Sequence, residues 1–160
     1  NVWSGLSIPY MAIGYEVEQV PLQTLNLYNT VANNGKMMKP LFVQEIRRSG
    51  KVVERFPPVV LKDKICSRST IDKVKKCLEG VMKNGTGSDL KSVEFNIAGK
   101  TGTAEVRGKA DSSLFAAITP AQEPDYGIVA MLEEAGFGSA VAAPMAARVL
   151  QKEREKKVSI

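Results

Sequence analysis

The sequence predicts a fold that contains both α-helices and β-strands, which alternate along the chain. Two segments in the first half, 21–34 and 69–84, repeat apolar residues at helical spacing. Three strand-like runs follow one another over 95–133, before a last segment of helical pattern. With 160 residues and 44% hydrophobic content, the chain has the size and composition of one globular domain or a part of one.

The first predicted helix covers residues 21–34. Its apolar positions are Leu22, Leu25, Tyr28, Val31 and Ala32. Pro21 suits the first helical turn and Gly35 suits the stop. Val20 stands at the expected N-cap, where its side chain cannot accept a backbone N–H bond.

A strand pair and a second helix come next. Residues 42–56 predict two strands around a Ser49–Gly50 turn. The helix over 69–84 is the clearest in the sequence, and Ser69 with Asp72 resembles a capping box at its start. Its predicted apolar face consists of Ile71, Val74, Cys77, Leu78, Val81 and Met82. On that face Cys77 is expected to be a buried small apolar residue.

The second half predicts a loop, three strands and a helix. The loop is the polar segment 84–89, which separates the second helix from the strands. The three strand-like runs are 95–106, 113–119 and 126–133. The last helix is expected to begin near Ser139 or Ala140 and to include Pro144 in its first turn.

Composition excludes several classes of function. The net charge is +5, but the basic residues are dispersed among acids, without the basic stripe and interleaved aromatics that favour nucleic-acid binding. The chain has no histidine, which excludes a Ser-His-Asp triad within it and disfavours a zinc site. Cys66 and Cys77 have no metal or redox spacing and are expected to lie too far apart for a disulfide. No apolar run is long enough to cross a membrane.

The segment "NIAGKTGTAEV" (96–106) places polar residues where a strand should be apolar. "GKT" at 99–101 is also the end of a phosphate-binding loop, but that loop needs a glycine at position 94, which is Glu94. "GTGSDL" at 85–90 lacks the third glycine of a dinucleotide fingerprint and follows a helix. Neither segment therefore predicts a nucleotide site.

As a strand, the same segment has two interpretations. Alternation places Thr101 and Thr103 on one face, about 6–7 Å apart, where two hydroxyls can bind the carboxylate of an extended ligand. Gly102 lets a ligand backbone lie close to the strand, and Lys100 adds positive charge. The alternative is an edge strand whose lysine protects it against aggregation.

The surroundings of this segment resemble a known family, the transpeptidase domain of penicillin-binding proteins. The likeness covers nearly the whole chain and keeps the family's order. Five features carry it: "AIGYEVEQVPLQTLNLYNTVANNGKMMKP" (12–40), "VMKNGTGS" (81–88), "AGKTGTAE" (98–105), "LFAAITPAQEPDYGIVAML" (114–132) and "GFGSAVAAP" (136–144). The alanine after "KTGT" and the "VAAP" segment are similar to the monofunctional class B proteins.

The chain lacks two of the family's three motifs, S-x-x-K with the nucleophile and S-x-N. Upstream of Lys100 the only S-x-x-K is Ser88 to Lys91, in the loop beside the strand, and it is interpreted as a coincidence. Residues 1–160 are therefore expected to be the C-terminal part of one transpeptidase domain, inactive alone and with an exposed apolar face. Val20 and Ala117 depart from the threonine and glycine usual at these positions, and the "RGKADSS" loop (107–113) is short.

The resemblance implies a fold and site roles. The resemblance implies the α+β class: the complete domain has a five-stranded antiparallel sheet covered by helices, the penicillin-binding and serine β-lactamase-like fold, of which this chain would lack the helix that bears the nucleophile. Lys100 and Thr103 are the expected catalytic residues: Lys100 adds positive potential beside the nucleophile, and the Thr103 backbone N–H is one oxyanion-hole donor. Thr101, Gly102 and Thr103 are expected to bind substrate, with both threonine hydroxyls on its carboxylate.

The resemblance also implies partners and a location. The substrates are peptidoglycan stem peptides ending in D-Ala-D-Ala, and β-lactams acylate the same serine. The partner of this chain is the rest of the transpeptidase domain, with no metal, cofactor or nucleic acid. Such enzymes work on the extracytoplasmic face of the bacterial cell membrane, held by an upstream anchor. Two alternatives remain: a non-catalytic module that binds peptide or β-lactam, and a hydrolase of the same fold, either a D,D-carboxypeptidase or a β-lactamase.

Overall fold

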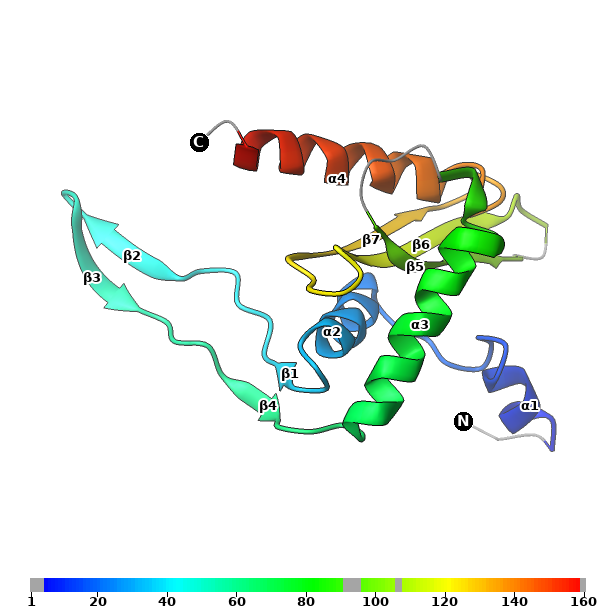
Figure 1. Ribbon diagram of the computed structural model, residues 1–160, viewed down its shortest axis with the longest axis horizontal. Coiled ribbons are helices and arrows are strands. Elements are labelled where there is room, and N and C mark those ends of the chain that lie inside the picture. The colour runs from blue at the N-terminus through cyan, green and yellow to red at the C-terminus, as the bar shows by residue number, and fades with distance from the viewer. Residues whose placement is uncertain (1–4, 91–95, 106–107, 159–160) are drawn as a thin grey trace.

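The computed structural model describes residues 5–90, 96–105 and 108–158 (Figure 1). The helices are α1 (Ser7–Met11), α2 (Pro21–Ala32), α3 (Arg68–Asn84) and α4 (Ala142–Val158), with a 3₁₀ turn at Ser88–Leu90. The strands are β1 (Met37–Met38), β2 (Glu45–Arg48), β3 (Lys51–Arg55), β4 (Val60–Lys62), β5 (Ala98–Ala104), β6 (Ser112–Thr119) and β7 (Tyr126–Leu132). The α+β class predicted from the sequence is confirmed.

The central element is an antiparallel sheet of three strands in the order β5-β6-β7. Phe115 in the middle of β6 pairs with Thr101 on one side and with Ala130 on the other. The three predicted strand-like runs are therefore all strands of one sheet. Residues 95 and 106, at the ends of the first run, lie outside the described residues.

Helices cover both faces of this sheet (Figure 1). On one face, Phe115 and Ala117 are completely buried in a cluster with Ala146 and Leu150 of α4. On the other face, Ile118 packs in a cluster with Val31 of α2. Adjacent residues of a strand point to opposite faces, so the residues of β6 alternate between the α4 side and the α2 side of the sheet. Each residue of β5 points to the same side as the β6 residue with which it pairs.

Helix α2 begins at Pro21 and ends at Ala32, two residues before the predicted end. Gly35 has a φ of +91°, and its N–H donates to the carbonyl of Thr30 at 2.8 Å, as expected for a glycine that ends a helix. Val20 is the N-cap and its side chain makes no capping bond, as predicted. The Gln23 side chain makes the other half of a capping box, because its Oε1 accepts from the Val20 N–H at 3.0 Å.

The predicted cap of α3 was wrong by two residues. Ser67 is the N-cap, with extended backbone, and its Oγ accepts from the Thr70 N–H at 3.1 Å. Ser69 lies inside the helix, where its hydroxyl cannot cap the first turn. Both serines precede the same apolar stripe, so the sequence pattern could not distinguish them.

The buried stripe of α3 also differs from the predicted one. Cys77 is exposed rather than buried, and Val74 is 36% exposed. Lys75 is buried in their place, with its Nζ donating to the Ala32 carbonyl and to Asn34 Oδ1, each at 3.4 Å. Burial is the main cause that lowers the Lys75 pKa. The helix is therefore rotated so that the side carrying Ile71, Lys75 and Met82 meets the rest of the chain.

The strands β2 and β3 form the predicted hairpin, which extends away from the body (Figure 1). Ser49 and Gly50 at its turn have φ values of +50° and +78°, as a two-residue hairpin turn requires. The short elements α1, β1 and β4 were not predicted. No helix within the described ranges is long and apolar enough to span a bilayer.

Several large apolar side chains are exposed. Among the described residues, those that are at least 65% exposed are Phe42, Ile8, Ile13 and Phe137, of which Phe42 reaches 81%. They lie in separate segments of the chain, so the single exposed apolar face stays a prediction.

The Ser67 cap generates a stability prediction. Ser67→Ala is expected to lower the free energy of unfolding of the chain by about 1 kcal/mol, because the Thr70 N–H loses its side-chain acceptor and keeps only the Ser67 carbonyl. Ser69→Ala is the matched control: it removes the exposed bond between the Ser67 and Ser69 hydroxyls but leaves the Ser67 cap in place, so it should change the free energy of unfolding by less than about 0.5 kcal/mol. Urea denaturation followed by circular dichroism measures both; a larger loss for Ser69→Ala would contradict the assigned cap.

Candidate functional site

The "KTGT" segment lies in the middle of β5, an outer strand of the described three-stranded sheet. Its four residues pair in order with Ala116, Phe115, Leu114 and Ser113 of β6. An outer strand has alternate N–H and C=O groups that point away from its neighbour. The segment is thus hydrogen-bonded to β6 along one edge, and along its other edge N–H and C=O groups of the backbone point away from the sheet.

The predicted alternation of the motif is observed. Thr101 and Thr103 pair with Phe115 and Ser113, so both threonines belong to the sheet face covered by α4. Lys100 pairs with Ala116 and belongs to the opposite face. The lysine and the two hydroxyls therefore leave the strand on different sides.

Thr101 is buried, with 7% of its surface exposed. Its Oγ1 lies 2.6 Å from Oγ1 of Thr86, which belongs to the loop between α3 and the 3₁₀ turn. Sequence reasoning placed Thr86 in a loop and gave it no part in the site. The only signal was its position in "NGTGSD", inside the segment that resembles the family's loop ahead of this strand.

Thr103 is exposed, and its Oγ1 accepts a hydrogen bond from the Gly138 N–H at 3.2 Å. Beside it, Ser113 Oγ donates to the Gly136 carbonyl at 2.6 Å. These two bonds attach the loop before α4 to neighbouring positions on β5 and β6. Sequence reasoning assigned this loop to the entry of the last helix and did not place it against Thr103.

Gly138 allows this contact because it has no side chain. A Cβ there would clash with the carbonyl oxygen of Gly102 and lie 2.6 Å from that of Leu114. Gly99 is also confined: a Cβ there would lie 2.8 Å from the Ala117 Cβ. Both glycines are therefore fixed by close approach rather than by an unusual φ.

Lys100 is exposed, and its Nζ donates to the carbonyl oxygen of Thr101 at 2.5 Å. The ammonium group thus lies against the backbone of its own strand. This arrangement holds a positive charge next to Gly102 and Thr103, where it can attract an anionic ligand.

Known proteins resemble this chain in sequence and in fold. Residues 1–151 match the family described as the penicillin binding protein transpeptidase domain. The chain belongs to this family. The class B type that the sequence predicted is confirmed by relatives that include FtsI-, MrdA- and PbpB-type proteins.

Three relatives illustrate the match. A peptidoglycan D,D-transpeptidase FtsI homologue of Mesostigma viride is 28% identical, over 88% of this chain and 27% of its own length. Penicillin-binding protein 2 of Pseudomonas aeruginosa is 27% identical with a TM-score of 0.76, over 94% of this chain and 33% of that one. The imipenem acyl-enzyme of penicillin-binding protein A from M. tuberculosis has a TM-score of 0.74 at 22% identity, covering 84% and 31%. The chain spans only about a third or less of these relatives.

Within the part of the chain that the structure describes, the other candidate groups of the sequence gather into no second site. Ser88 begins the 3₁₀ turn, and Lys91, its partner in the isolated S-x-x-K, lies outside the described residues. Cys66 and Cys77 are free thiols, as predicted. Within the described ranges, no three His, Cys, Asp or Glu side chains gather where they could hold a metal ion.

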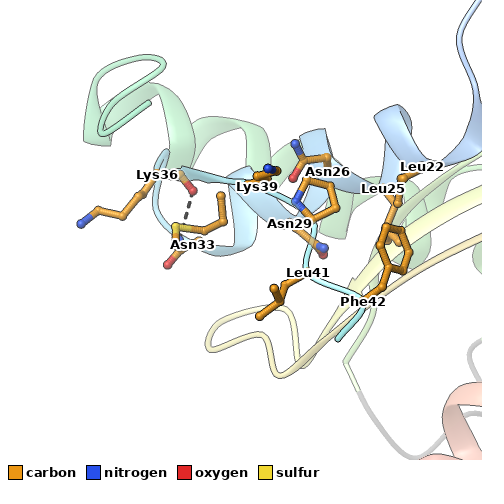
Figure 2. A pocket seen from close by; sticks show the side chains of 11 residues that line it. Leu22, Leu25, Asn26, Asn29, Asn33, Lys36, Lys39, Leu41 and Phe42 are labelled. Atoms are coloured by element: carbon orange, nitrogen blue, oxygen red, sulfur yellow. Dashed lines mark hydrogen bonds between the residues drawn. The ribbon is translucent and has the colours of Figure 1, made fainter. Parts of the chain in front are cut away.

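A cleft of about 360 Å³ lies away from the penicillin-binding protein motif, between α2 and the segment 36–42 (Figure 2). Asparagine and lysine side chains and several apolar residues line it. Its lining includes Asn26, Asn29, Asn33, Lys36, Lys39 and Phe42, and none of the motif residues. The cleft is therefore separate from the predicted site.

The close approach at Gly138 generates a prediction. Gly138→Ala is expected to lower the free energy of unfolding by about 2 kcal/mol, because the new Cβ must displace the carbonyl groups of Gly102 and Leu114. Gly80→Ala is the control, since nothing lies within 4 Å of its Cβ position in α3. That change should stabilise the chain by about 0.5–1 kcal/mol. Urea denaturation distinguishes the two, and equal effects would contradict the assigned contact.

Proposed function

We propose that residues 1–160 are the C-terminal part of a peptidoglycan D,D-transpeptidase domain and form one wall of its active site. The observation that carries this proposal is the "KTGT" segment on an outer strand, paired to β6 on one side only, in a chain of this family. Thr103 and Lys100 are exposed there. The substrate is a peptidoglycan stem peptide ending in D-Ala-D-Ala, which lies along the free side of the strand.

The reaction uses a serine supplied by the upstream part of the domain. Its oxygen attacks the carbonyl between the two D-alanines, the C–N bond breaks, and the terminal D-alanine leaves with a proton on its amine. The resulting ester is then attacked by the amine of a second stem peptide. The new amide forms the cross-link, and the serine regains its proton.

The residues of this chain bind and polarise the substrate. The Thr103 backbone N–H is one of the two donors to the oxyanion, and a preorganised donor of this kind contributes about 3–4 kcal/mol to the transition state. Lys100 supplies positive potential beside the nucleophile and the terminal carboxylate. The hydroxyls of Thr101 and Thr103 bind that carboxylate, and Gly102 leaves room for the peptide backbone. No metal or cofactor takes part.

The same site accepts β-lactams, which acylate the upstream serine. M. tuberculosis penicillin-binding protein A, which shares the fold, has been solved as an imipenem acyl-enzyme. A β-lactam carries a carboxylate and a strained amide in the arrangement of the terminal dipeptide. The contacts proposed for the stem peptide therefore serve the antibiotic as well.

This chain needs the rest of its domain to act. The exposed apolar side chains Ile8, Ile13, Phe42 and Phe137 are available to pack against that part. The parent protein is expected to be attached to the bacterial cell membrane by an upstream segment. Its transpeptidase domain then lies on the extracytoplasmic side, where peptidoglycan is assembled.

Covalent labelling tests the proposal directly. A fluorescent penicillin is incubated with this chain and with the longest protein that carries it, and intact mass measures the adduct. The longer protein should gain one adduct at a serine upstream of Asn1, and this chain none. A stoichiometric adduct on the chain itself would contradict the proposal, and Ser88 would then be the first residue to substitute.

The role of Lys100 gives a second test in the longer protein. Lys100→Met keeps the aliphatic stem but removes the charge, and it should lower the rate of acylation by penicillin about 100-fold. Lys109→Met is the control, because Lys109 is exposed and forms a surface ion pair with Glu134 at 2.9 Å. Its rate should stay within about twofold of the unchanged protein. Stopped-flow fluorescence measures both rates, and similar rates for the two variants would exclude the assigned role of Lys100.

A further inference from the structure

The hydroxyl pair of Thr86 and Thr101 joins the loop after α3 to the motif strand. The two Oγ1 atoms lie 2.6 Å apart, so one hydroxyl donates its proton to the other. Thr101 is 7% exposed, whereas Thr86 is open to solvent. The two hydroxyls therefore differ in their access to water.

The loop that carries Thr86 is held in place by its own backbone. The N–H groups of Gly85 and Gly87 both donate to the Val81 carbonyl, at 3.0 and 3.2 Å, and the Ser88 N–H donates to the Gly85 carbonyl at 3.0 Å. Gly87 is also packed against the Met82 side chain so closely that an added Cβ would overlap its sulfur. The position of Thr86 beside Thr101 is therefore fixed by a hydrogen-bonded and packed turn.

A hydroxyl has one proton to donate, and its direction decides what Thr101 can bind. If Thr101 donates to Thr86, it has no proton left for a ligand carboxylate, which can only accept. If Thr86 donates, the Thr101 proton is free, and accepting a bond makes that hydroxyl a stronger donor. Thr86 can meet its remaining hydrogen bonds with water because it is exposed.

We propose that Thr86 is a positioning residue, which donates its proton to Thr101 Oγ1 and thereby directs the Thr101 proton to the carboxylate of the bound ligand. This inference rests on the proposed function, because it deepens the carboxylate contact of the same site. Thr86 acts only through Thr101 and does not touch the ligand. Through Thr86, the site reacts faster with ligands that carry a carboxylate than with neutral ligands of the same shape.

The test uses the longest protein that carries this chain and two probes, benzylpenicillin and its methyl ester. Second-order rate constants for acylation are measured for the unchanged protein, Thr86→Val and Thr86→Ser. Valine keeps the shape of threonine without the hydroxyl, and serine keeps the hydroxyl. The quantity compared is the ratio of the rate constant for the acid to that for the ester, within one preparation.

Thr86→Val is expected to lower the acid rate constant about 10-fold and the ester rate constant by less than about twofold, so the ratio falls about 5- to 10-fold. Thr86→Ser should keep the ratio within about twofold of the unchanged protein. A poorly folded variant lowers both rate constants alike and leaves the ratio interpretable.

Two other results would overturn the inference. An unchanged ratio in Thr86→Val, whether the two rate constants stay the same or fall together, would mean that Thr86 has a structural role only. A ratio that falls as far in Thr86→Ser would exclude the hydroxyl as the cause. Absence of labelling of the unchanged protein by benzylpenicillin would instead overturn the proposed function, and this inference with it.

Discussion

The pairing of β5 with β6 is the constraint on which the rest of the site depends. β5 carries a lysine and two threonines in its middle, so its own side chains supply little apolar burial. The strand is held by the backbone ladder to β6, whose Phe115 and Ala117 are completely buried under α4. β6 supplies the core, and β5 is thereby free to carry polar residues that a central strand could not accommodate.

The site also requires that the backbone of the loop before α4 lie close to the backbone of β5. The loop before α4 reaches β5 at Gly138 and bonds to Thr103, and it reaches β6 at Gly136 and bonds to Ser113. At Gly138 no side chain fits between this loop and the carbonyl of Gly102. The beginning of α4 thus supports the face of the motif strand that carries both threonine hydroxyls.

The two threonines of the motif have unequal surroundings, although they share one face of the strand. Thr101 is enclosed by the loop after α3, whereas Thr103 remains exposed and bonds to the opposite loop. Lys100 leaves the strand on the other face and returns to its backbone. The motif is therefore held from two sides, while the other edge of β5 pairs with no strand among the described residues.

The sequence alone determined the features that depend on neighbouring residues. Pro21 and Gly35 marked the ends of α2, Ser49–Gly50 marked the hairpin turn, and alternation placed Thr101 and Thr103 on one face. The family motif was also local, because its residues are consecutive. Even so, local patterns could not choose between Ser67 and Ser69 as a cap, since both precede the same stripe.

Only the tertiary structure decided which surfaces meet. The buried side of α3 carries Lys75 rather than Cys77, because the rotation of a helix is set by the elements it packs against and not by its own pattern. Thr86 and Thr101 are 15 positions apart, and Thr103 and Gly138 are 35 apart. Such contacts form only when separate loops close over one strand, so no spacing in the sequence could predict them.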